Sequence, residues 1–207
     1  MLTSLSSPFI LVSSPMLEDD CFQQAVILIV EYNKHGAIGF ILNKPKPIAL
    51  NSVVKNTEFH IPEYIPTWFG GPVSLNSGIV LADQTLAKSS PEDATIVQNA
   101  ISLSSNNDAI QQLVNHAETF SEELQRLGHS AHTHIDTALY PYRFVVGYSG
   151  WGPGQLEAEI RRGSWLEVPM DLELVFRTPW DQMWDRATQH MGVKASAFTT
   201  TAQPLLN

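Results

Sequence analysis

The sequence lacks the features that mark a secreted or membrane-spanning protein. Its single cysteine, Cys21, cannot form a disulfide within the chain. The longest apolar run, residues 25–30, is far shorter than the roughly 18–20 residues that span a bilayer. The N-terminal residues carry no basic segment of the kind that precedes the apolar part of a secretory signal. We therefore expect a cytoplasmic protein with no membrane association.

Basic residues are also scarce. The chain has 12 Lys and Arg against 21 Asp and Glu, which gives a formal net charge of -9. Neutralisation of phosphates supplies most non-specific affinity for nucleic acids, so an acidic chain without a basic stripe is a poor partner for DNA. No helix-turn-helix pattern is present either. We expect no direct binding of nucleic acid.

The length and the apolar content predict one folded domain. The chain has 207 residues, of which 43% are hydrophobic, and single cores commonly extend to roughly 150–250 residues. No repeat or linker divides it, and no feature sets an oligomeric state. We predict a single domain over residues 1–192 and a mobile C-terminal tail, rich in Ala, Thr and Ser, over residues 193–207.

The periodicity of apolar residues predicts a mixture of strands and helices, and hence an α+β fold. Steps of three and four residues indicate helices that pack one face on a sheet, and short apolar runs bounded by Gly, Pro or polar residues indicate strands. The expected strands are residues 9–12, 25–31, 37–42, 67–73, 78–82, 95–103, 142–147, 164–168 and 172–176, and the expected helices are residues 110–127, 155–162 and a last helix that begins at Thr178.

Residues 147–160, GYSGWGPGQLEAEI, imitate two catalytic or binding motifs. The segment matches the first three positions of the Gly-x-Ser-x-Gly nucleophile elbow, with Ser149 as the nucleophile, but Trp151 stands where a small residue is needed. It also imitates the Gly-x-Gly-x-x-Gly loop of dinucleotide sites, but the third glycine falls on Gln155 and no repeated βαβ pattern surrounds it. Neither a serine hydrolase nor a dinucleotide site is predicted, and we expect no cofactor.

The two carboxylates of this segment do not form a catalytic pair. Glu157 and Glu159 lie two residues apart on a predicted helix, so their side chains point about 200° apart. Gln155 and Glu159 share one face. We predict a structural latch in which Trp151 is buried against the sheet and Gln155 or Glu159 bonds backbone groups of the bend at Gly70 and Gly71. The alternative is an enzyme site that gathers Asn43, Ser149, Gln155 and Glu159.

The histidines of the segment after residue 128 are the one cluster with metal-binding geometry. His132 and His134 project to the same side of an extended loop, with Asp136 as a third ligand. No cysteine and no His-x-x-x-His helix frames such a site, so we interpret these histidines as solvated and predict no metal.

Three motifs together resemble the YqgE/AlgH family over nearly the whole chain. They are a turn region that includes Asn43, the Gly70-Gly71-Pro72 bend, and the glycine-rich segment that begins at Gly147. The candidate ligand-binding or structural residues that these motifs supply are Asn43, Gly70, Gly71, Pro72, Ser149, Gly150, Trp151, Gly154, Gln155, Glu157 and Glu159.

The resemblance implies a bacterial cytoplasmic protein of α+β fold, with a bifurcated, mostly antiparallel sheet curled into a pseudo-barrel and flanking helices. It also implies a regulator of transcription in alginate synthesis. Because the sequence does not support direct DNA binding, we predict a non-enzymatic binding or regulatory protein that acts through a protein partner. The alternative remains an enzyme whose site lies around the glycine-rich segment.

Overall fold

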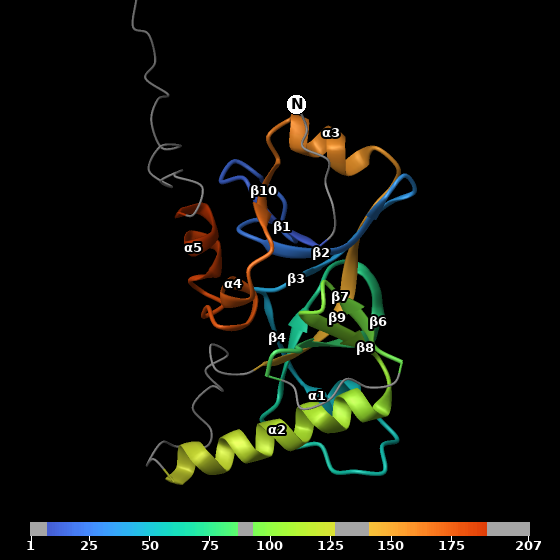
Figure 1. Cartoon of the computed structure of the whole chain (residues 1–207), viewed down its shortest axis with the longest axis vertical. Coiled ribbons are helices and arrows are strands. Elements are labelled where there is room, and N and C mark those ends of the chain that lie inside the picture. Colours follow the sequence, from blue (N-terminus) through green and yellow to red (C-terminus); the bar gives the residue numbers. More distant parts are fainter. Residues whose placement is uncertain (1–7, 87–92, 127–140, 190–207) are drawn as a thin grey trace, which may run out of the picture.

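The computed structural model describes residues 8–86, 93–126 and 141–189, in which ten strands form one branched sheet and five helices lie around it (Figure 1). The strands are β1 (Phe9–Ser13), β2 (Val26–Asn33), β3 (Gly36–Ile41), β4 (Pro45–Ala49), β5 (Pro66–Phe69), β6 (Val73–Asp83), β7 (Thr95–Val97), β8 (Ile101–Ser104), β9 (Tyr142–Trp151) and β10 (Trp165–Pro169). The helices are α1 (Leu50–Val53), α2 (Asn107–Arg126), α3 (Gln155–Arg161), α4 (Leu172–Phe176) and α5 (Met183–Gln189).

Strand β9 joins the two halves of the sheet. Its C-terminal end pairs with β3, where Gly39 lies opposite Ser149. Its N-terminal part pairs with β6 and, in the parallel direction, with β5. The main order is β10-β1-β2-β3-β9-β6-β8-β7, and β4 and β5 branch from β9. The sheet is thus bifurcated, curled and mostly antiparallel, which confirms the predicted α+β fold.

Alternation along the strands supplies three separate cores, because successive side chains point to opposite faces. In β1, Ile10 and Val12 face a central core between the halves of the sheet, whereas Phe9 and Leu11 face an outer core beneath α3. The strands of the second half divide their side chains between the same central core and another outer core beneath α2. Both faces of β1 and of the first half of β2 are therefore covered, which explains their continuous apolar runs.

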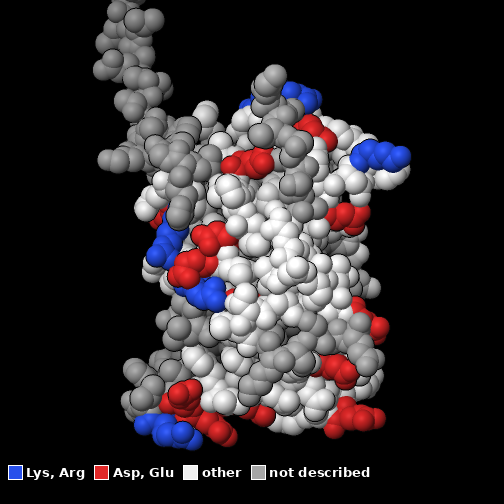
Figure 2. Space-filling view, viewed as in Figure 1, with Lys and Arg blue, Asp and Glu red and all other residues white. Residues whose placement is uncertain are grey.

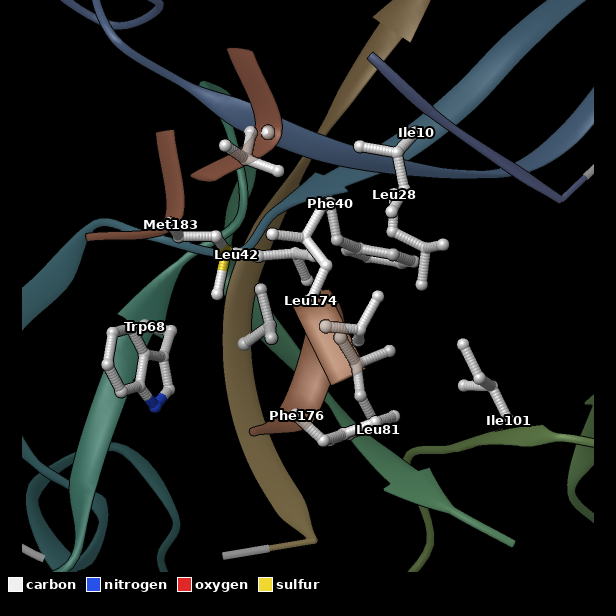
Figure 3. Packing of buried hydrophobic residues seen from close by; sticks show 14 of the residues in the cluster. Ile10, Leu28, Phe40, Leu42, Trp68, Leu81, Ile101, Leu174, Phe176 and Met183 are labelled. Carbon is white, nitrogen blue, oxygen red and sulfur yellow. The ribbon is translucent and has the colours of Figure 1, made fainter. Parts of the chain in front are cut away.

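Helices α4 and α5 close the side of the central core (Figure 1). Leu174 and Phe176 of α4 enter it with Met183 of α5, and they meet Leu42 and Leu81 from the sheet (Figure 3). Helix α2 covers the opposite half of the molecule. Its first turn is capped by Asn106, whose side-chain oxygen accepts a hydrogen bond from the backbone of Ala109 at 2.9 Å.

The structure corrects several predicted elements. Residues 172–176 form helix α4 rather than a strand, because the Asp171 side chain caps the backbone N–H of Glu173 at 2.9 Å. The last helix begins at Met183, since Thr178 does not act as its N-cap and donates its hydroxyl to the Glu173 carbonyl instead. The expected strand over residues 95–103 is a hairpin of β7 and β8. Strand β4 was not predicted.

Other predictions concern residues that the structure does not describe. The predicted tail, residues 193–207, and the histidines His132 and His134 lie outside the described residues. Within the described part of the chain, every helix is too short or too polar to span a membrane.

Candidate functional site

The carboxylate of Glu159 fastens the glycine-rich segment to β10. One oxygen, Oε2, accepts hydrogen bonds from the indole N–H groups of Trp151 at 2.9 Å and Trp165 at 2.7 Å. The other oxygen, Oε1, accepts from the Gln155 amide at 2.9 Å. Because the two indole donors belong to β9 and β10, the arrangement holds α3 against the sheet. We call Trp151, Gln155, Glu159 and Trp165 the indole clamp.

Aromatic packing surrounds the indole clamp. The rings of Trp151 and Trp165 meet edge to face, with centroids 6.0 Å apart, and Phe22 meets Trp165 in the same manner at 5.5 Å. Both tryptophans are buried, with 7% and 3% of their surface exposed. Such edge-to-face contacts add to the stabilisation from burial alone. This confirms the prediction that Trp151 is buried against the sheet.

The turn before α3 and the first residues of this helix are held by side chains of the same segment. The side-chain oxygen of Gln155 accepts a hydrogen bond from the backbone N–H of Gly152 at 3.0 Å, and Gly154 adopts a left-handed conformation with φ of 74°. Glu157 accepts a hydrogen bond from the Tyr32 hydroxyl at 2.7 Å. Burial, together with this bond to Glu157, raises the pKa of Tyr32 to about 12. Each of these contacts positions backbone or ring groups.

Ser149 bonds the Gly70-Gly71 bend. Its buried hydroxyl donates to the Gly70 carbonyl at 3.0 Å, and the Gly70 N–H donates to Val146 in the same strand, β9. The prediction that Gln155 or Glu159 bonds this bend is therefore wrong. Strand β9 continues past Gly147, and its pairing brings Ser149 beside the bend. The residues of β9 that follow pair with β3 instead.

Two further candidates next to these motifs are exposed. Gly150 lies opposite Ile38 in the pairing of β9 with β3, and Pro72 follows the bend immediately before β6. Neither residue lies in the indole clamp.

Asn43 lies apart from both the indole clamp and the bend. Its side chain is buried and bridges the backbone of the preceding loop: Oδ1 accepts from the Val26 N–H at 2.9 Å, and Nδ2 donates to the Gln24 carbonyl at 2.7 Å. The four side chains of the alternative enzyme site are thus divided among three places. Gln155 and Glu159 are hydrogen-bonded to each other, Ser149 bonds the bend, and Asn43 bonds the backbone at the start of β2.

A cleft of about 520 Å³ adjoins Asn43, and most of the residues that line it were not identified from the sequence. One wall comes from α5 and the turn before it, and the other from the loop before β2 and the turn after β3. The lining residues are Gln23, Gln24, Asn43, Lys44, Pro45, Trp180, Asp181, Trp184 and Asp185. The sequence feature that could have pointed to this cleft is the pair of tryptophans and the pair of aspartates within residues 180–185.

The charged and aromatic groups of this cleft differ in exposure. Trp180 is 42% exposed, whereas Trp184 is buried and donates its indole N–H to the Ser13 carbonyl at 3.0 Å. Lys44 donates to the Asp20 carbonyl at 3.3 Å, and burial lowers the pKa of its ammonium group. Asp181 and Asp185 are exposed. The cleft therefore combines one partly buried cation, two carboxylates and an accessible indole.

The central core holds a second feature that the sequence did not reveal. Arg143 of β9 is fully buried, donates to the Leu42 carbonyl at 2.6 Å and lies over the Trp68 ring, 4.8 Å from its centroid. Desolvation lowers the pKa of its guanidinium to about 10. Nearby, the buried carboxylate of Asp83 pairs with Arg177 at 2.8 Å and ties α4 to β6. Arg143 thus links β9 to the turn after β3, although its Nε and Nη2 atoms are buried without a hydrogen-bond partner among the described residues.

Comparison with known proteins places this fold in a family. The family model described as AlgH-like matches residues 10–196. The chain belongs to the YqgE/AlgH family. The matched range contains the bend, the glycine-rich segment, the indole clamp and the cleft.

Relatives and solved structures agree with this assignment. A UPF0301 protein of Thioalkalivibrio sulfidiphilus is 32% identical over 93% of this chain and 92% of its own length, and one of Idiomarina loihiensis is 32% identical over 88% and 89%. The solution structure of the AlgH protein from Pseudomonas aeruginosa matches 98% of both chains, with a TM-score of 0.64 and 25% identity. A crystal structure from Corynebacterium diphtheriae, at 20% identity and a TM-score of 0.65, shares the fold.

Proposed function

We propose that the protein is a non-enzymatic binding protein with a regulatory role, and that it acts by contacting a partner protein through the cleft between α5 and the turn after β3. The observation that carries this proposal is a difference between the polar groups of the glycine-rich segment and those of the cleft. The polar side chains of the glycine-rich segment are engaged in bonds that fix the fold. In the cleft, by contrast, the exposed carboxylates of Asp181 and Asp185 have no partner among the described residues, and the Trp180 ring is accessible.

The indole clamp supports a structural rather than a catalytic role for its residues. A general base needs a lone pair directed at the substrate, within about 2.6–3.2 Å of the proton that it removes. Oε2 of Glu159 accepts bonds from two buried indoles, Oε1 accepts from the exposed Gln155 amide, and the Ser149 hydroxyl is buried against Gly70. The alternative enzyme would have to break these bonds before reaction.

The cleft has the dimensions of a binding site and a mostly polar lining. Its volume of about 520 Å³ falls within the range of roughly 300–1,000 Å³ that is usual for ligand pockets. Among the described residues, neither Asp181 nor Asp185 has a hydrogen-bonding or ionic partner for its carboxylate. Unpaired charges beside an accessible ring are groups available to a partner.

We expect no specific binding to duplex DNA. Blue basic groups on the face shown in Figure 2 are separated by white and red surface and form no stripe across the described residues of that face. With a net charge of -9, any association should be weak and should vanish as salt screens it. Fluorescence anisotropy with labelled duplexes at physiological salt would test this. Sub-micromolar affinity would contradict the expectation.

Affinity capture with matched variants tests the role of the cleft. The native protein, the double variant Asp181→Asn/Asp185→Asn and the control Glu122→Gln/Glu123→Gln would be immobilised and exposed to bacterial lysate. Both variants remove two negative charges, but the control removes them from α2. We expect a protein that the native chain and the control retain and that the cleft variant loses. Equal retention by all three would contradict the proposal.

A further inference from the structure

We propose that the cleft binds the arginine side chain of an exposed peptide segment in the partner protein. This inference rests on the proposed function and adds the chemistry of the ligand. It follows from three properties of the cleft: two unpaired carboxylates on one wall, an indole face beside them, and a cation with two amides on the opposite wall.

The carboxylates supply the charge that an arginine requires. Asp181 lies in the turn before α5 and Asp185 in the first turn of this helix, and both line the cleft. The neighbouring arginines are engaged elsewhere, because Arg177 pairs with Asp83 and Arg186 donates to the Thr178 hydroxyl at 3.1 Å. A guanidinium group presents several N–H donors in one plane, so it can bond both oxygens of a carboxylate.

The indoles favour a guanidinium over an ammonium group. Trp180 is 42% exposed and lines the cleft, and the buried Trp184, which also lines it, is fixed by its bond to Ser13. Guanidinium groups are weakly hydrated and stack on aromatic faces, whereas ammonium groups keep their water more strongly. An arginine side chain would therefore use the ring and the carboxylates together.

The opposite wall selects a ligand with one cation and adjacent acceptors. Lys44 lines this wall and would repel any cation, so a guanidinium would bind on the side of Asp181 and Asp185. A polyamine, which carries further positive charges toward Lys44, is disfavoured more strongly. The ammonium of Lys44 and the side-chain amides of Gln23 and Gln24 can donate hydrogen bonds to peptide carbonyls. A short peptide with a single arginine presents such carbonyls on either side of its charge.

The test uses the indole N–H resonances of the five tryptophans in the ¹⁵N-labelled full chain. The protein would be titrated with acetyl-Gly-Arg-Gly-amide, with acetyl-Gly-Gln-Gly-amide, and with propylguanidinium, which carries the cation without a peptide backbone. We expect a saturable shift of the Trp180 resonance with the arginine peptide, at least about tenfold weaker binding of the other two probes, and unchanged Trp151 and Trp165 resonances. Asp181→Asn/Asp185→Asn should weaken arginine-peptide binding about tenfold, as expected for the loss of charge-assisted hydrogen bonds, and Glu122→Gln/Glu123→Gln should leave it unchanged.

Several results would overturn the inference. Equal shifts with the glutamine peptide, or undiminished binding by the Asp181→Asn/Asp185→Asn variant, would show that the carboxylates do not recognise a cation. Propylguanidinium binding as tightly as the peptide would assign the cleft to free organic cations. The absence of a Trp180 shift with every probe, in a protein that still captures a partner through the cleft, would refute the arginine assignment alone. Equal capture of proteins by the native chain, the Asp181→Asn/Asp185→Asn variant and the control would refute the proposed function itself.

Discussion

Replacing Trp151 with alanine is expected to lower the free energy of unfolding by about 3–5 kcal/mol. The ring is 7% exposed, contacts Trp165 edge to face and donates its N–H to Glu159. The substitution removes this packing, opens a cavity between α3 and the sheet, and leaves Glu159 with one donor fewer. Denaturant unfolding followed by circular dichroism would measure the loss. Trp180→Ala, which truncates an exposed ring instead, should cost far less.

Glu159→Gln separates the hydrogen bonds of the indole clamp from its packing. The rings remain, and the amide oxygen can still accept from the N–H groups of Trp151 and Trp165, but these bonds lose the negative charge of the acceptor. The new NH2 group also takes the place of the oxygen that accepts from the Gln155 amide, so that two donors face each other. We expect a loss of about 1–3 kcal/mol, smaller than that of Trp151→Ala. The Trp151→Ala variant could instead have the same free energy of unfolding as the native protein and fail to capture a partner. The ring would then be a binding element, and the indole clamp would have no structural role.

The positions of the strands were predictable because a strand is marked by a short run of apolar residues, which is a local feature of the sequence. Five of the six residues from Ala25 to Val30 are fully buried, and a continuous apolar run of that length fits a strand covered on both faces. The sequence could not specify how the two halves of the sheet join. That depends on β9 changing partners from β6 to β3, which is a property of long-range pairing.

Helix α4 shows where the local signal fails. The segment Leu-Glu-Leu-Val-Phe over residues 172–176 alternates in part like a strand, and a run of this length is ambiguous between the two structures. Capping by Asp171 and burial of Leu174, Val175 and Phe176 in the central core decide for the helix. The capping residue was visible in the sequence, but the core that it faces was not.

The candidate site was predictable to a similar extent. Spacing correctly excluded a shared role for Glu157 and Glu159, which bond different groups in the structure. It did not reveal Trp165, since that partner of Glu159 comes from a neighbouring strand. The cleft was missed for the same reason. Lys44 and Asp185 lie far apart in the chain and line the same cleft only because α5 packs beside β1 and β2.

Gly71→Ala is expected to destabilise the protein by more than about 4 kcal/mol or to prevent folding. Gly71 has φ of 147°, a conformation that side chains with a Cβ atom rarely adopt. An added Cβ would also overlap the backbone of Tyr148 and the hydroxyl oxygen of Ser149. Relief would require the bend to move away from β9 and would break the bond between Ser149 and Gly70. Soluble yield and denaturant unfolding would measure the effect.

Gly163→Ala provides the matched control, because it separates backbone conformation from crowding. Gly163 also has a positive φ, 77°, but a Cβ added there would meet no atom within 4 Å. Only the conformational cost should appear, about 1–2 kcal/mol. A much larger loss at Gly71 than at Gly163 would show that close packing of the bend against β9 imposes the glycine. Equal losses would mean that the bend shifts to accept a side chain, and that the contact between Ser149 and Gly70 contributes little to stability.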